Sequence, residues 1–238
     1  MAARAQLEQL LKARKLDITL VDARPASETV ADAADLAVTG VPAIDAALGG
    51  GLRRGHLSEI VGGRSSGRTT AVCRALSAAA ARGDLVALID TCDRFDPASA
   101  AAFGLDLTRL LWIRDTGDAT RALKAMNLVL QAGGFGLVVL DLADVALPVV
   151  RALPFTTWFR LARVIEGSQT VALLVAADHV ARGSSGATID LARADMTARV
   201  AQSDAVPGLT HARWRGRSDR SRLLQGLEMQ PRVVGARS

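Results

Sequence analysis

The chain has 238 residues, half of them hydrophobic, which is enough for one large domain with a sizeable core. Its two cysteines and three histidines exclude a disulfide-stapled module and a zinc protein, and no apolar run reaches the ~20 residues of a membrane span. The last forty residues hold eight arginines against three acidic side chains, which accounts for the whole net charge of +5. We therefore expect a soluble cytoplasmic protein with a neutral body and a basic end, and no membrane partner.

Residues 1–37 have the pattern of an arm and a linker rather than of a domain. Leu7, Leu10 and Leu11 recur at the spacing of one helix face. Residues 17–22 then alternate like a strand, which places Ile18 and Leu20 on one face. Residues 26–37 are rich in alanine and acidic residues without a clear period, which indicates a linker. The arm either packs on a partner or folds back onto its own core, and the pattern leaves both open.

Residues 38–202 have the pattern of a core domain, in which apolar runs alternate with helical stretches. We expect strands at Leu57–Val61, Leu85–Asp90, Leu110–Ile113, Leu137–Asp141 and Thr170–Ala176, and helices near 69–82, 97–103, 118–132 and 155–167. Continuous apolar strands separated by helices are typical of a parallel sheet that is covered on both faces. The sequence therefore predicts an α/β fold with a mostly parallel, helix-covered sheet.

A glycine-rich loop follows the first of these strands and leads into a helix, which is the context of a phosphate-binding loop. Its backbone N–H groups and the helix N-terminus would surround a phosphate. The candidate nucleotide-binding residues are Gly62, Gly63, Arg64, Ser65, Ser66, Gly67, Arg68, Thr69 and Thr70. Thr69 stands where a hydroxyl would bind Mg²⁺, whereas Arg68 replaces the lysine, whose compact ammonium a planar guanidinium does not reproduce. Weak binding of ATP with Mg²⁺ and a relic loop that only maintains the fold both remain open.

The basic segment, residues 203–238, has short strand-like stretches. Together with Met196–Ala201, the stretches near Trp214 and Leu227 predict an antiparallel extension of the fold. The candidate DNA-binding or partner-binding residues of this segment are Arg213, Trp214, Arg215, Arg217, Arg220 and Arg222. Clustered arginines around an aromatic ring suit a polyanion or an acidic partner, and a merely solvated hairpin is the alternative.

Several motifs of the core domain resemble RecA and its relatives in the same order along the chain. They are the stretch Thr39–Leu52 before the loop, the loop 62–70 itself, Leu88–Pro97, Asp115–Asp118, and Leu137–Asp141, which is similar to a Walker B strand ending in Asp141. The resemblance covers roughly residues 5 to 200. It implies a RecA-like P-loop core.

At the catalytic positions of that family the sequence departs from the pattern. Cys92 stands where the resemblance implies a water-activating glutamate, and Asp93 beside it would point the other way from a strand end. Ala177 and Asp178 stand where it implies an Asn-Gln pair that senses the γ-phosphate. We therefore expect no catalytic residue and a degenerate ATPase site.

Among RecA relatives the chain is most similar to the ImuA family, RecA-like accessory proteins of the bacterial mutasome. A RecA-type carboxy-terminal domain does not fit the residues after the core. The resemblance implies an adaptor of SOS mutagenesis and translesion DNA synthesis that binds RecA, an ImuB-type polymerase subunit or both, and that is nucleoid-associated when active. A RecA-family DNA-dependent ATPase with a degenerate but working nucleotide site, and a plain single-stranded-DNA binder, are the alternatives.

Overall fold

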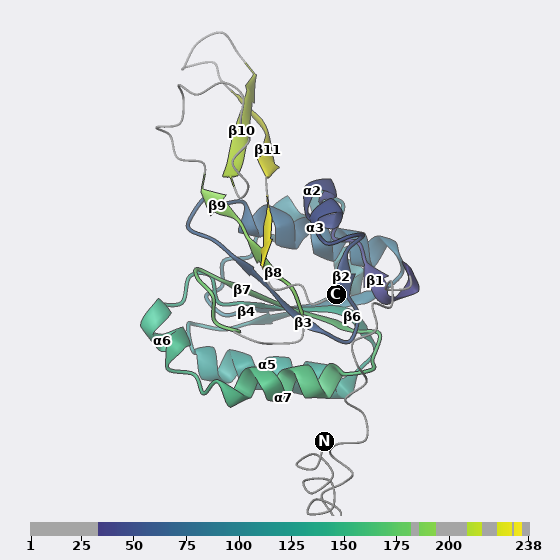
Figure 1. The fold of residues 1–238 in the computed structure, drawn as a ribbon, viewed down its shortest axis with the longest axis vertical. Coiled ribbons are helices and arrows are strands. Elements are labelled where there is room, and N and C mark those ends of the chain that lie inside the picture. The colour runs from purple at the N-terminus through teal and green to yellow at the C-terminus, as the bar shows by residue number, and fades with distance from the viewer. Residues whose placement is uncertain (1–32, 182–185, 194–208, 216–222, 230, 235–238) are drawn as a thin grey trace, which may run out of the picture. The chain divides into compact units, whose positions relative to one another are not determined.

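The computed structural model describes residues 33–181, 186–193, 209–215, 223–229 and 231–234, all within one compact unit, Ala33–Arg237. A seven-stranded sheet forms its centre (Figure 1). In spatial order its strands are β12 (Arg232–Val234), β8 (Thr188–Asp190), β3 (Leu57–Val61), β7 (Val171–Ala176), β6 (Phe135–Asp141), β4 (Leu85–Asp90) and β5 (Leu110–Arg114). Every neighbouring pair is parallel except β12 with β8. The predicted α/β fold with a mostly parallel sheet is confirmed.

The central strands form where the sequence is rich in apolar residues, with Ser58 and Glu59 as the polar residues of β3. Every residue of β3 and of β7 is buried, and so are the five central residues of β6. Strands covered on both faces have this continuous pattern because no position is left for solvent. The five strands expected from the sequence begin and end within two residues of the observed bounds.

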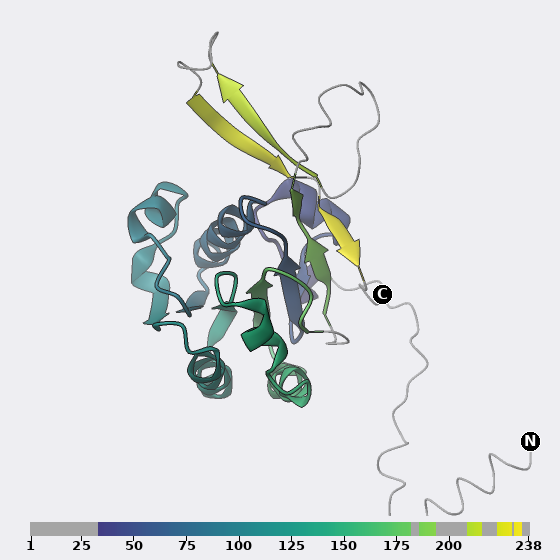
Figure 2. The same cartoon turned by 90° about the vertical axis from the view of Figure 1, so that its left-hand side faces the viewer.

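Helices cover the two faces of the sheet (Figures 1 and 2). One core layer joins α3 (Arg68–Ala81) and α4 (Pro97–Ala102) to one face of the strands, and a second joins α5 (Ala119–Ala132) and α7 (Thr156–Ile165) to the other. Alternate strand residues serve the two layers: Leu88 and Val139 belong to the first, Ile89 and Leu140 to the second. Both views show α5 and α7 side by side.

Side-chain caps explain where two of these helices begin. The carboxylate of Asp96 accepts the N–H groups of Ala98 and Ser99 at the start of α4. The carboxylate of Asp118 accepts those of Thr120 and Arg121 at the start of α5. Such acceptors satisfy N–H groups that have no partner inside the helix.

Several short elements were not expected from the sequence. The prediction of a linker over residues 26–37 is wrong at the end of that range. There η2 (Ala33–Asp35) leads into β1 (Leu36–Ala37), and β1 pairs antiparallel with β2 (Leu52–Arg53). Between these two strands lies α2 (Pro42–Ala47), and η3 (Leu107–Arg109) precedes β5. After β6 comes α6 (Leu147–Arg151), where no helix was expected. All are six residues or shorter, so they show little periodicity.

The basic segment contains an antiparallel pair, as predicted. Strand β10 (Leu209–Arg215) pairs with β11 (Leu223–Met229), with an irregularity between Arg213 and Trp214, and β10 also pairs in parallel with β9 (Ala192–Arg193). Arg213, Trp214 and Arg215 therefore lie on β10. The other predicted binding residues of the segment (Arg217, Arg220, Arg222), the strand Met196–Ala201 and the arm residues (Leu7, Leu10, Leu11, Ile18, Leu20) lie outside the described residues.

Within the described ranges, the helices are all too short or too polar to cross a membrane.

Candidate nucleotide-binding loop

The predicted loop lies at the carboxyl end of β3 and runs directly into α3. Its turn is closed by a hydrogen bond from the N–H of Ser66 to the carbonyl of Gly63 at 3.3 Å. The N–H of Ala71 bonds the carbonyl of Gly67 at 2.9 Å and so begins the helix. Gly63, Arg64, Ser65 and Thr69 are exposed, whereas Ser66, Gly67 and Arg68 are buried. The loop therefore has the chain path expected of a phosphate-binding loop.

Two glycines are required by this path. A Cβ atom on Gly62 would lie 2.4 Å from the carbonyl oxygen of Leu191, on the segment after β8. Gly67 has a φ of 95°, in the left-handed region that other residues adopt only with strain. Gly63 meets neither condition, so its hydrogen side chain is not demanded by the fold.

Arg68, the first residue of α3, turns its guanidinium into the protein. Its side chain is buried with 8% of the residue exposed, and Nη1 donates a hydrogen bond of 2.9 Å to the carbonyl oxygen of Ala176. Ala176 is the last residue of β7. Burial lowers the pKa of the guanidinium, and the nearby carboxylates of Asp141 and Asp144 partly offset this. The cation that would grip a phosphate is therefore used in a contact with the protein's own backbone.

Asp141 ends β6 beside Asp90, its register partner on β4. One of its carboxylate oxygens accepts the N–H of Ala143 at 2.9 Å. Burial raises the pKa of Asp141 to about 6; the charge of Asp90 adds to this, while the Ala143 hydrogen bond and Arg68 oppose it. A carboxyl group with this pKa loses its proton less readily than an ordinary aspartate.

The residues around Asp141 are committed to other contacts. Asp144 lies 3.7 Å from Arg64 and 4.0 Å from Arg94. Asp90 is buried, and its two oxygens accept the N–H groups of Arg94 and Phe95 at 2.9 and 2.8 Å. No cluster of three His, Cys, Asp or Glu side chains suited to a metal ion occurs among the residues that the structure describes. Arg68, which stands at the lysine position, is bound to the carbonyl of Ala176 and is not exposed in the loop.

Cys92 and Asp93, the two residues at the expected position of a general base, both interact with charged neighbours. Burial, and then the charges of Asp144 and Asp141, raise the pKa of the Cys92 thiol. Asp93 forms a bidentate pair with Arg114, whose Nε and Nη2 each lie 2.7 Å from a carboxylate oxygen. Arg114 in turn lies over the ring of Trp112 at 4.9 Å. The carboxylate of Asp93 is thus held at the sheet edge by a cation.

The position expected to sense a γ-phosphate is also occupied by an ion pair. One oxygen of Asp178 accepts a hydrogen bond from Arg151 Nη2 at 2.6 Å, and the other accepts the N–H of His179 at 2.8 Å. The hydrogen bond from His179 and the charge of Arg151 lower the pKa of Asp178. This pair ties the segment after β7 to the end of α6.

Glu59 is an organising residue that the sequence analysis missed. It lies in the middle of β3 with 2% of the residue exposed. One carboxylate oxygen accepts the N–H groups of Val180 and Ala181 at 3.2 and 3.0 Å, and the other accepts the hydroxyl of Thr188 at 2.8 Å. The signal was a charged residue inside an apolar run, because buried carboxylates require such partners.

The raised pKa of Asp141 predicts a stability change with pH. Between pH 4 and 7 the folded state holds this proton more tightly than the unfolded chain, so ionisation of Asp141 lowers the free energy of unfolding as pH rises. The variant Asp141→Asn keeps the acceptor for Ala143 and cannot ionise. Relative to the wild type it should gain about 2–3 kcal/mol in urea unfolding between pH 4 and 7.

The matched control for that experiment is Asp106→Asn. The hydroxyl of Thr108 lowers the pKa of Asp106, so this carboxylate is ionised in both the folded and the unfolded state above about pH 4, and the difference between Asp106→Asn and the wild type should stay nearly constant between pH 4 and 7. A difference between Asp141→Asn and the wild type that stays constant with pH would contradict the assignment.

Comparison with known proteins agrees with the geometry of the loop and the sheet. A family model described as the RecA N-terminal domain matches residues 10–152, more than half of the chain. The chain is similar to RecA of Chlorobaculum tepidum, 36% identical over 111 residues, and to RecA of Mycobacterium ulcerans, 39% identical over 112 residues. These stretches cover 46% of this chain and 32% of each relative, so the chain spans about a third of the relatives' length. The chain therefore belongs to the RecA N-terminal domain family.

Proposed function

We propose that the chain is a non-catalytic RecA-family accessory protein of the ImuA type, which acts in SOS mutagenesis and translesion DNA synthesis. It serves as an adaptor for RecA, for an ImuB-type polymerase subunit, or for both. The observation that carries this proposal is the hydrogen bond from Arg68 to the carbonyl of Ala176, which uses the phosphate-binding cation inside the fold.

The Arg68 contact opposes nucleotide binding on energetic grounds. To reach a phosphate, the guanidinium must leave a hydrogen bond that is worth roughly 1.5–3 kcal/mol when a charged group is involved. The carbonyl of Ala176 would then lose this donor. The interactions between Arg68 and a phosphate must first offset the free energy of this lost hydrogen bond, and only the remainder contributes to affinity.

The other catalytic positions support the same conclusion. A general base contributes typically ~10²–10⁴ to an enzymatic rate. Cys92 has a raised pKa and Asp93 is paired with Arg114, so neither supplies that base. Asp178 is paired with Arg151 at the position of the γ-phosphate sensor. Three separate parts of a RecA-type ATPase are therefore replaced or occupied.

Association with RecA is supported by the layout of the amino-terminal arm and by one edge of the sheet. The resemblance to RecA implies a helix and a strand that pack onto a neighbouring protomer, and residues 5–22 have that pattern. Within the described residues, β5 pairs only with β4, and its Leu111 is 42% exposed. Addition of a strand to such an edge is a recurrent mode of recognition.

Single-stranded DNA is the second partner that we propose. Arg213, Trp214 and Arg215 follow one another on β10, so the segment supplies cations and an aromatic residue within one strand. Backbone phosphates and unstacked bases are the groups that such residues bind.

The first prediction of the proposal concerns ATP. The purified protein should hydrolyse ATP no faster than the variant Thr69→Ala, with or without single-stranded DNA, because base and sensor are missing. Both should stay below about 0.1 s⁻¹, under the common enzymatic range. A coupled assay of ADP release measures this, with RecA as the positive control. Faster turnover that disappears in Thr69→Ala would favour the alternative, a DNA-dependent ATPase.

The second prediction concerns RecA binding by the arm. The double variant Leu10→Ser/Leu11→Ser removes apolar side chains from the expected helix face and should weaken binding to purified RecA at least tenfold in biolayer interferometry. The control Gln6→Ser/Gln9→Ser changes polar residues of the same segment and should bind like the wild type. Equal binding by all three proteins would discard the arm as the contact, and the same assay with an ImuB-type subunit separates the two partners.

A further inference from the structure

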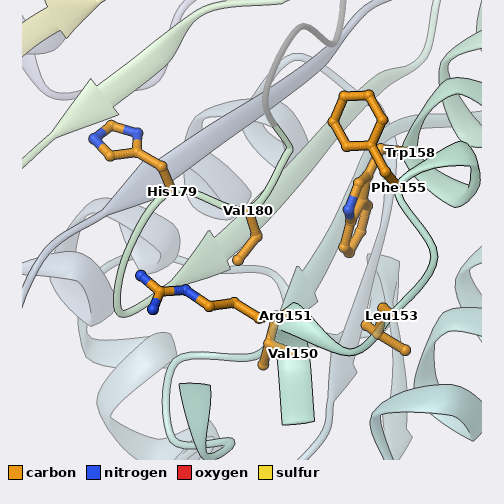
Figure 3. Close-up of a pocket in the computed structure, with 7 residues that line it drawn as sticks. All are labelled: Val150, Arg151, Leu153, Phe155, Trp158, His179 and Val180. Atoms are coloured by element: carbon orange, nitrogen blue, oxygen red, sulfur yellow. The ribbon is translucent and has the colours of Figure 1, made fainter. Parts of the chain in front are cut away.

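A hollow of about 240 Å³ lies where α6, the start of α7 and the segment after β7 meet (Figure 3). Arg151 and His179 border one end of the hollow, and Phe155 and Trp158 border the other. Its lining includes no residue of the amino-terminal arm or of the basic segment. The hollow is therefore separate from the contacts that we propose for RecA and for DNA.

Trp158 gives this hollow a buried hydrogen-bond donor. Only 2% of the residue is exposed, and among the residues that the structure describes its indole N–H has no acceptor. The indole N–H of Trp112, by contrast, donates to a carboxylate oxygen of Asp90 at 3.3 Å. Figure 3 shows the ring nitrogen of Trp158 on the side that faces Val180 and Arg151. Because buried polar groups of native proteins have partners almost without exception, this N–H is suited to an acceptor atom of a ligand.

The charged groups at the other end of the hollow are already paired. Nη2 of Arg151 donates a hydrogen bond of 2.6 Å to Asp178. Nδ1 of His179 lies 3.4 Å from a carboxylate oxygen of Glu59. An ion that entered the hollow would lose its hydration without finding an uncompensated opposite charge. The hollow therefore suits an uncharged ligand.

The remaining walls are apolar. Val150 and Val180 are buried, and Leu153 packs against the same core layer. A cavity of about 150 Å³ is enough to hold benzene, so about 240 Å³ has room for about eight to ten non-hydrogen atoms. A ring with a few attached atoms fits this size, whereas the amide group of an asparagine or glutamine side chain would leave most of the hollow empty.

Water is the simplest alternative occupant. A water molecule would accept the N–H of Trp158, but it would not cover the apolar walls formed by Val150 and Leu153. An organic ring with one acceptor atom meets both requirements. A carbonyl oxygen is such an acceptor and carries no charge.

We propose that this hollow binds a small uncharged ring compound that carries a carbonyl oxygen, of the lactam or cyclic imide class. The carbonyl oxygen accepts the indole N–H of Trp158, and the ring carbons cover Val150 and Leu153. This goes beyond the proposed adaptor function, because it assigns a small-molecule site on a part of the chain that the arm and the basic segment do not involve.

The test is an NMR titration of the ¹⁵N-labelled full chain with ε-caprolactam, a soluble lactam of suitable size. The chain has three tryptophans, so the indole N–H signals are few, and Trp158→Phe and Trp112→Phe assign two of them. The indole signal of Trp158 should shift in a saturable way with a Kd of about 1 mM, the range expected for so small a ligand. The indole signal of Trp112, already bonded to Asp90, should stay in place as the internal control.

Three variants test the location of the site. Leu153→Phe enlarges a side chain in the wall, keeps the N–H of Trp158, and should weaken binding at least tenfold. The matched control Val149→Phe enlarges a side chain that is 49% exposed on α6, outside the hollow, and should bind like the wild type. Trp158→Phe, followed through the backbone N–H signals of Val150 and Val180, should also weaken binding at least tenfold. Circular dichroism checks that each variant is folded.

Further titrations identify the ligand class. Hexanoate, which is similar in size but charged, should bind at least tenfold more weakly than ε-caprolactam. A Trp158 signal that stays in place at tens of millimolar ε-caprolactam would show that water alone fills the hollow and would overturn the proposal. Undiminished binding by Leu153→Phe, or binding of hexanoate as tight as that of the lactam, would also overturn it.

Nucleic acid is the last occupant to be tested. An oligodeoxythymidine that shifts the Trp158 signal at a lower concentration than ε-caprolactam would assign the hollow to nucleic acid and contradict the proposal. No partner protein takes part in these titrations, so a failure here is distinct from a failure of the adaptor function.

Discussion

The hydrogen bond from the Arg68 guanidinium to the carbonyl oxygen of Ala176 fixes the side chain at the lysine position of the loop inside the fold. It joins the first turn of α3 to the last residue of β7. The guanidinium is buried near the carboxylates of Asp141 and Asp144, so its positive charge lies close to their negative charges. The cation at the lysine position of the loop is thus bound inside the protein.

Internal contacts hold the whole carboxyl end of the sheet in the same way. Glu59 binds the segment after β7 through two hydrogen bonds and Thr188 of β8 through a third. Asp178 and Arg151 tie that segment to α6. Glu59, Asp178 and Arg151 are thus all bound to groups within the protein.

Most of the fold could be predicted from the sequence, because long apolar strands and their intervening helices carry strong local patterns. Elements such as α6 and β8 could not, since three to five residues show no period. The inward orientation of the Arg68 side chain could not be predicted either, because the carbonyl that it binds lies 108 residues further along the chain. The role of Glu59 was missed for the same reason, because its hydrogen-bond partners follow about 120 residues later. A single carboxylate in a mainly apolar strand does not by itself indicate which groups bind it. Sequence patterns report local structure, while these contacts depend on which strands become neighbours.

The most direct measurement of the central claim is the effect of ATP with Mg²⁺ on stability, compared between the wild type and Arg68→Lys. A ligand that binds the folded state raises its stability by RT ln(1 + [L]/Kd), or about 2.7 kcal/mol at a hundredfold excess over Kd. Lysine is shorter, lacks the guanidinium fork, and has the ammonium that phosphate-binding loops use. We predict that millimolar ATP with Mg²⁺ leaves the Tm of the wild type unchanged and raises that of Arg68→Lys. A rise in the Tm of the wild type equal to that of the variant would contradict the claim that Arg68 closes the loop.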